Sequence, residues 1–141
     1  MIRNKNVTLL RVLLAAVLAL TAMPKAHAES LIVEAESFSK RGGWVVDQQF
    51  MDLMGSPYLI AHGMGVPVSD AVTTVNINSG GTYQVYVRTY NWTSPWSAKP
   101  GAGAFEVSVG GKRLHTVGQT GNRWQWQKAG TVRLKAGKTQ L

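Results

Sequence analysis

The sequence predicts an all-β fold, a sandwich of two antiparallel sheets, and three observations favour this fold. All 15 glycines lie from Gly42 onwards, where they separate short apolar runs, as is typical of sandwiches. Tyr83, Val85 and Val87 alternate with polar or aromatic residues at the period of a half-buried strand. No stretch after residue 28 shows a convincing helical period.

Eight segments carry the strand pattern, and turn residues separate them. Ser79-Gly80-Gly81 predicts a turn before the aromatic strand. Gly110-Gly111 predicts a tight hairpin, because a primed two-residue turn needs positive φ at both central positions. The expected strands are 31–37, 43–49, 57–62, 71–77, 82–90, 104–109, 112–116 and 124–134. The side chains expected to face inward from the last part of the chain are Phe105, Val107, Val109, Val132 and Leu134.

The end of the sequence indicates one more strand. Ala136-Gly137-Lys138 indicates a turn, and Thr139-Gln140-Leu141 has the character of a strand that has just begun. A sandwich one strand short would leave an open edge with unpaired backbone groups. We therefore expect a fragment of a longer protein that lacks its closing strand; the alternative is a short frayed end.

Residues 1–28 have the pattern of a secretory signal peptide. Arg3, Lys5 and Arg11 supply positive charge, 12–20 is apolar, and Ala26-His27-Ala28 matches a small-residue cleavage site. The apolar stretch is too short to span a bilayer. We therefore expect a mature chain of 29–141, one domain that is secreted or periplasmic, with no membrane span after cleavage. An uncleaved anchor is the alternative.

The mature part carries a mild positive charge that is spread along its length. Four of the 15 Lys and Arg lie before residue 29 and all 7 acids lie at or after it, which leaves eleven basic against seven acidic side chains, a balance of +4. The absence of a basic run argues against a nucleic-acid partner. The chain has no cysteine, which excludes disulfides and thiolate metal sites.

Residues 81–96 lead from a strand into a loop that carries several large aromatic side chains. Aromatic rings offer a broad apolar face with a polar edge, which suits the C–H face of a sugar. Polar neighbours on the same strand and loop, and the histidine of a glycine-rich turn, would orient such a ligand. The predicted ligand-binding residues are Tyr90, Trp92, Trp96, Arg88, Asn91 and His62. The alternative is that the tryptophans fold back as a lid over the core.

Five motifs occur in an order that resembles a known family. They are LIVEAESF, VVDQQFMDLMGSPYLIAHGMG, GTYQVYVRTYNW, PGAGAFEVSVGGK and WQWQKAGTVRLKAGK. Together they resemble the N-terminal galactose-binding-like β-sandwich of secreted bacterial FAD-dependent oxidoreductases. More loosely, the domain is similar to carbohydrate-binding modules of families six and thirty-five.

The resemblance covers essentially 31–141 and implies several properties. It implies a jelly-roll of two antiparallel sheets, sugar binding by loop aromatics and a structural Ca²⁺ near the first strand. The resemblance places the ion on Glu34 and Glu36, which would point the same way on a strand and offer hard oxygen ligands. The alternative is that both are ordinary solvent-facing acids. The sequence departs from the family in lacking the closing strand and its aspartate, which would leave fewer ligands.

Catalysis is not expected within these residues. The candidate carboxylates for glycoside cleavage are Asp47, Asp52, Asp70 and Glu106, but sequence spacing places no two of them at the required separation. No nucleophile elbow occurs. The Gly-x-Gly patterns at 63–65 and 101–103 lack the dinucleotide-binding spacing, so no flavin is expected to bind this segment.

The sequence therefore predicts a non-catalytic carbohydrate-binding accessory domain of an exported protein. Its partner would be a glycan or polysaccharide, and an enzyme domain would follow it in the longer protein. The alternative is an N-terminal structural fragment of a secreted FAD-dependent oxidoreductase, with no sugar binding of its own.

Overall fold

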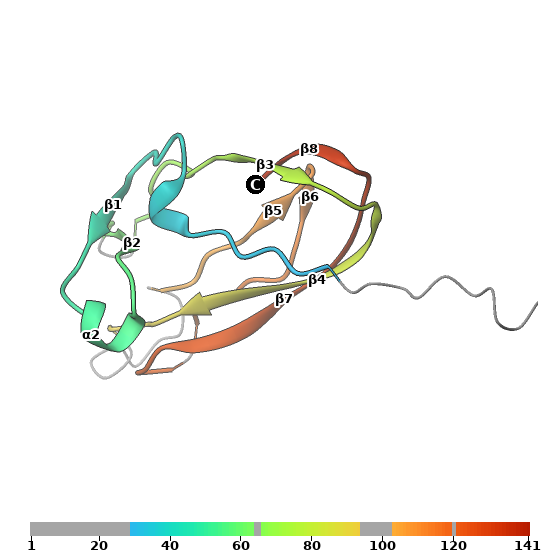
Figure 1. Ribbon diagram of the computed structural model, residues 1–141. Coiled ribbons are helices and arrows are strands. Elements are labelled where there is room, and N and C mark those ends of the chain that lie inside the picture. Colours follow the sequence, from blue (N-terminus) through green and yellow to red (C-terminus); the bar gives the residue numbers. More distant parts are fainter. Residues whose placement is uncertain (1–28, 64–65, 94–102, 120) are drawn as a thin grey trace, which may run out of the picture. The chain divides into compact units, whose positions relative to one another are not determined.

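The longest ladder of the protein pairs β4 (Gly81–Thr89) with β7 (Gln125–Leu134) in antiparallel register (Figure 1). The computed structural model describes residues 29–63, 66–93, 103–119 and 121–141. Ile32–Leu141 cluster as one unit, and the description below concerns that unit. The predicted signal peptide, 1–28, lies outside the described residues.

β7 contains a β-bulge, and the outward-facing residues of the strand are even-numbered before the bulge and odd-numbered after it. Val85 lies opposite Gly130 and Tyr86 opposite Lys128, so β7 carries one extra residue at Ala129. Gly130 has a φ of 149°, a backbone conformation that residues with a Cβ atom rarely adopt. As a result Trp126 and Lys128 face outward before the bulge, whereas Thr131 and Arg133 do so after it.

A hairpin lies next to β7. Its tip joins β5 (Ser108–Val109) to β6 (Lys112–Arg113) through Gly110 and Gly111, whose φ values of 58° and 79° confirm the predicted turn. The two arms continue as far as Phe105 and Val117, which exchange backbone hydrogen bonds of 3.0 and 2.9 Å. The amide of His115 donates to the carbonyl of Ala129 at 2.8 Å and so ties the second arm to β7.

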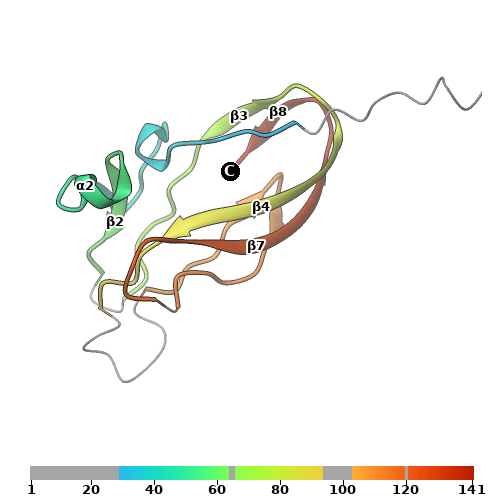
Figure 2. The ribbon, with the colours of Figure 1, turned by 60° about the horizontal axis from the view of Figure 1, so that its bottom comes forward.

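Residues 139–140 belong to a strand, as the sequence predicted, but this strand begins at Gly137, within the predicted turn. β8 (Gly137–Gln140) pairs antiparallel with β3 (Thr74–Ile77), and Leu141 exchanges hydrogen bonds with Thr73 beyond them. The connections β3–β4 and β7–β8 lie side by side at one end of the β4–β7 ladder (Figures 1 and 2). A missing closing strand stays a prediction.

The core gathers the inward-facing side chains of β4, β7 and the hairpin. Val109, Leu114, Val117, Ala129 and Val132 are its buried members. The partly buried side chains packed against them are Tyr83, Val85, Val87, Phe105, Val107, Leu134 and Leu141. The five side chains predicted to face inward are all among these, because strand alternation decides which side of a half-buried strand is apolar.

A second region lies at the other end of the β4–β7 ladder. β1 (Trp44–Asp47) pairs antiparallel with β2 (Tyr58–Ala61), and the short helix α2 (Met51–Met54) connects them. Gly55, with a φ of 92°, ends α2 in the left-handed conformation that glycine favours. Figure 1 shows α2 beside the end of β4.

The predicted first strand, 31–37, is wrong. Ala35–Ser37 instead form the 3₁₀ turn η1, in which both the amide and the hydroxyl of Ser37 donate to the carbonyl of Glu34, at 3.1 and 2.6 Å. Leu31 and Ile32 are 47% and 76% exposed. Serine competes for local backbone groups, and within the described residues the first strand-type pairing of this part of the chain is the bridge between Lys40 and Val72.

The fold is all-β with antiparallel sheets, as predicted. The other expected strands appear with their ends shifted by a few residues, and the two arms of the hairpin are regular only near its tip. Among the described residues, no helix has the length and apolar character needed to cross a membrane.

Candidate functional site

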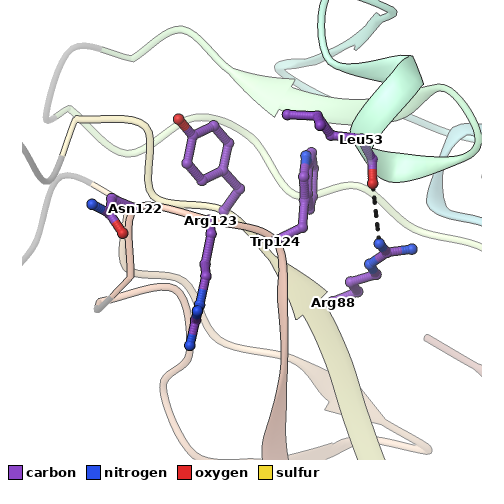
Figure 3. Close-up of a pocket in the computed structure, with 6 residues that line it drawn as sticks. Leu53, Arg88, Asn122, Arg123 and Trp124 are labelled. Carbon is purple, nitrogen blue, oxygen red and sulfur yellow. Dashed lines mark hydrogen bonds between the residues drawn. The ribbon is translucent and has the colours of Figure 1, made fainter.

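A shallow cavity of about 270 Å³ lies where the end of the β4–β7 ladder meets α2; we call it the α2 cavity (Figure 3). Its lining comes from α2, from the end of β4 and from the residues that lead into β7. The lining residues are Leu53, Arg88, Tyr90, Asn122, Arg123 and Trp124.

Two aromatic rings meet in this cavity, one from the residue that follows β4 and one from the residue that precedes β7. Thr89 lies opposite Gln125, so continuing the ladder by one residue brings Tyr90 to Trp124. Their ring centroids are 5.6 Å apart with the planes at 44°. Among the described residues the enclosed Trp124 Nε1–H has no hydrogen-bond acceptor, so ring contacts hold this indole in place.

Two rings from the second region pack against this pair. The ring of Phe50 meets Tyr90 edge-on at 5.3 Å, and the ring of Tyr58 meets Trp124 at 4.9 Å. Edge-to-face pairs at these separations are favourable because the positive ring edge meets the negative face. The four rings therefore join β1–α2–β2 to the β4–β7 ladder.

Arg88 fastens α2 to β4. Its Nη1 donates to the carbonyl of Met54 at 2.7 Å and its Nη2 to the carbonyl of Leu53 at 3.4 Å, the second of which Figure 3 draws. The last carbonyls of a helix have no partner within it and attract cations. Arg88 therefore lines the α2 cavity and also holds α2, which forms another side of the cavity, in place; we call this contact the Arg88 clamp.

Asp47 and Tyr58 hold the segment that leads into α2. Asp47 Oδ1 accepts the amides of Gln48 and Gln49 at 2.7 and 3.1 Å. The Tyr58 hydroxyl donates to Asp47 Oδ2 and accepts the amide of Phe50, each at 3.1 Å. The hydrogen bond from the amide of Gln49 is the largest cause that lowers the pKa of Asp47, whereas burial raises the pKa of Tyr58.

Two residues of the lining, Arg88 and Arg123, are cationic. Arg123 and Asn122 are exposed, and Figure 3 shows the Arg123 guanidinium pointing away from the carbonyl of Leu53 that Arg88 binds. The described part of the chain contributes no carboxylate to the lining. Its chemistry is that of a small binding site, with rings for contact area and guanidinium and amide groups that donate hydrogen bonds.

The predicted ligand-binding residues fall into three groups. Tyr90 and Arg88 line the α2 cavity. Trp92, 39% exposed, and His62, also exposed, are not in its lining. Trp96 lies outside the described residues.

Asn91, the remaining predicted ligand-binding residue, is buried and hydrogen-bonded within the protein. It is 4% exposed; its Nδ2 donates to the carbonyl of Gln119 at 3.3 Å, and its Oδ1 accepts the hydroxyl of Thr93 at 2.7 Å. Its amide group therefore holds two loops together within the protein. Asn91 lies two residues after buried Thr89, so continuing the alternation of β4 places it on the same inward side.

Four lining residues were not predicted from the sequence: Leu53, Asn122, Arg123 and Trp124. The sequence did contain a signal for Trp124: if the two longest expected strands, 82–90 and 124–134, pair antiparallel from end to end, Trp124 lies near Tyr90. Leu53 had no such signal, since a four-residue helix is too short to show a hydrophobic period.

The predicted calcium ligands do not have the geometry on which the prediction rested. Glu34 precedes η1 and Glu36 lies within it, so the two do not share a strand face. No group of three or more His, Cys, Asp or Glu side chains gathers among the described residues. Because Ca²⁺ takes six to eight oxygen ligands, including backbone carbonyls, a structural Ca²⁺ near these residues stays a prediction.

Comparison of the chain with protein-family models, with curated proteins and with solved structures finds no match in any of the three. The functional proposal below is therefore built on the α2 cavity and the strands around it.

Proposed function

We propose that this is a non-catalytic carbohydrate-binding domain of an exported protein and that the α2 cavity is its sugar site. The observation that supports it is the pairing of two large rings, Tyr90 and Trp124, in a lining that also holds two arginines and one asparagine and, among the described residues, no carboxylate. The described residues of this lining include no Ser, Cys, His, Asp or Glu.

The cavity matches the two kinds of surface that a sugar presents. The C–H face of the sugar would lie against the rings, while its hydroxyl oxygens would accept hydrogen bonds from Arg123, Asn122 and Arg88. Its volume lies just below the roughly 300–1,000 Å³ of pockets that hold drug-sized ligands, so one sugar ring is the natural occupant. A dissociation constant on the order of tens of micromolar to millimolar suits so open a site.

Weak binding of this kind is useful when the domain is attached to something else. A tethered module raises the effective concentration of its neighbour at the bound chain. An accessory domain would in this way keep an exported enzyme near its polysaccharide.

One observation favours the alternative, a purely structural piece of a secreted FAD-dependent oxidoreductase. The rings of Tyr90 and Trp124 already pack against Phe50 and Tyr58, and α2 is clamped beside them by Arg88. Ring surface used in this way joins two parts of the domain whether or not a ligand binds.

Affinity electrophoresis of the full chain through gels containing a panel of neutral polysaccharides separates the two proposals. We expect Arg123→Ala to weaken retention about three- to tenfold, because a hydrogen bond from a charged donor is lost. Tyr90→Leu keeps apolar bulk but removes the ring, and we expect it to weaken retention further. Arg113→Ala is the matched control, because Arg113 lies on the hairpin, where it forms an exposed ion pair with Glu106.

Circular dichroism confirms that each variant is folded before retention is compared. Binding that is equal in the wild type, Arg123→Ala and Tyr90→Leu would remove the α2 cavity as the sugar site. No retention on any polysaccharide would favour the structural alternative.

A further inference from the structure

The outward face of the β4–β7 ladder continues the α2 cavity into solvent. Arg88 lies opposite Trp126, and Tyr86 lies opposite Lys128. Alternation places these four side chains on the side away from the core. Trp126 is 62% exposed and Tyr86 is 50% exposed, which is unusual for rings of this size.

Rings and cations recur in successive cross-strand pairs along this face. The first pair is Tyr90 with Trp124, which line the cavity. With increasing distance from the cavity, the second pair is Arg88 with Trp126 and the third is Tyr86 with Lys128. Outward positions on one strand are two residues apart, so three such pairs span about 14 Å. Each pair holds at least one ring, and each of the two outer pairs adds a cation.

The charge of this face has one sign. β4 and β7 contain no Asp or Glu, whereas their outward side chains include Arg88, Lys128 and Arg133, and Arg123 lies at the cavity rim. The short helix α2, which lies beside the end of β4, contains one acid, Asp52, and its side chain is exposed. The face therefore complements a ligand that is itself an anion.

We propose that this face, defined by Tyr86, Arg88, Trp126, Lys128 and Arg133, extends the α2 cavity into an elongated site for an acidic polysaccharide. Sugar rings lie against Trp126 and Tyr86, and Lys128 and Arg133 bind carboxylate or sulfate groups along the chain. The inference rests on the proposed function and names its substrate class.

The observations favour a glycan over other polyanions. A nucleic acid carries a charge at every nucleotide and calls for clustered Lys and Arg, whereas uncharged Gln84, Thr82 and Thr131 stand between the cations here. Proteins that bind a membrane surface insert a continuous apolar face into the lipid, whereas Trp126 and Tyr86 lie within strands and have charged neighbours.

The test compares polygalacturonate with fully methyl-esterified polygalacturonate, which keeps the chain and removes the charge. At low salt we expect the full chain to bind the acidic form several-fold more tightly, and the preference to fall as sodium chloride is raised to 0.5 M. We expect Trp126→Ala to weaken binding of both forms about tenfold, the effect of losing one stacked ring. Lys128→Ala should weaken only the acidic form, about three- to fivefold.

Two control variants match these changes in chemistry but lie elsewhere. Lys138→Ala removes an exposed cation of β8, and Val45→Ala removes an exposed apolar side chain of β1. Both should bind like the wild type. Because Trp126 and Lys128 are exposed, their variants should also unfold at the wild-type temperature.

The outcomes separate this inference from the proposed function. Equal affinity for both polygalacturonates, with Trp126→Ala and Lys128→Ala unchanged, overturns the inference but leaves sugar binding at the α2 cavity in place. Tighter binding to oligo(dT) or to phosphatidylserine vesicles than to polygalacturonate also overturns it. No binding to any polysaccharide overturns both.

Discussion

The two ends of the domain are stabilised in different ways. Around β4, β7 and the hairpin, Val109, Leu114, Val117 and Val132 are each no more than 9% exposed. In the region of β1, α2 and β2, Tyr58 is the one buried hydrophobic side chain of the described residues, and Val45, Met51 and Leu53 are exposed. The first region is held by apolar packing, and the second by a few hydrogen bonds and ring contacts.

The difference matters because the second region supplies one side of the α2 cavity. Regions with few buried apolar contacts open at a lower free energy than the core. We therefore expect α2 and its flanking strands to open before the β4–β7 ladder unfolds, and the affinity of the cavity to depend on that local equilibrium.

The largest effect is expected in the core. Val117 is 2% exposed, so Val117→Ala removes two buried methyl groups and leaves a cavity. We expect the free energy of unfolding to fall by roughly 2–3 kcal/mol, measured by urea denaturation. Val45→Ala, at an exposed position, should change it by less than about 0.5 kcal/mol. Equal losses in the two variants would contradict the comparison.

A smaller, local effect is expected for Tyr58→Phe. The variant keeps the ring but loses the hydrogen bonds to Asp47 and from the Phe50 amide. We expect a loss of about 1–2 kcal/mol, and faster amide hydrogen exchange in 44–61 than in the wild type. If the amides of β4 and β7 were to gain exchange rate by the same factor, the two regions would be one cooperative unit.

Arg88→Ala tests the clamp between the regions. Two carbonyls at the end of α2 lose their guanidinium donor, while the β4–β7 register is untouched. We expect about 1 kcal/mol of lost stability and faster exchange in α2. The control is Arg133→Ala, which removes an exposed cation from the same ladder and should leave hydrogen exchange in α2 unchanged. Identical exchange in α2 of both variants would show that the contact of Arg88 with α2 does not stabilise the helix.

The smallest effect is expected from acid. The pKa of Asp47 is lowered below its usual 3.8 in the folded protein, chiefly by the hydrogen bond from the amide of Gln49. A lowered folded-state pKa means that the stabilisation is fully present above pH 3.8 and is lost as the pH falls through the lower folded value. Exchange in 44–61 should therefore rise below pH 3.8 beyond the intrinsic pH dependence of exchange. Asp47→Asn should lack this extra rise; the same rise in the variant would assign it to another group.

Local sequence determined much of the fold. The alternation at Tyr83, Val85 and Val87 predicted β4 and the face it buries. Gly110-Gly111 predicted the hairpin turn, because few other residues adopt positive φ twice in succession. The strand pattern at 124–134 predicted β7, although not its bulge, which depends on the partner strand. Each of these predictions rests on the preferences of neighbouring residues.

Only the tertiary structure decided the site. Tyr90 and Trp124 meet because two strands distant in sequence pair in one particular register, and Arg88 reaches the carbonyls of Leu53 and Met54 across a similar separation. Residues 31–37, strand-like by pattern, form no strand because a strand needs a partner edge. By itself the sequence determined which segments extend and which turn. Which side chains meet depended on how those segments pair, and pairing is a property of the whole chain.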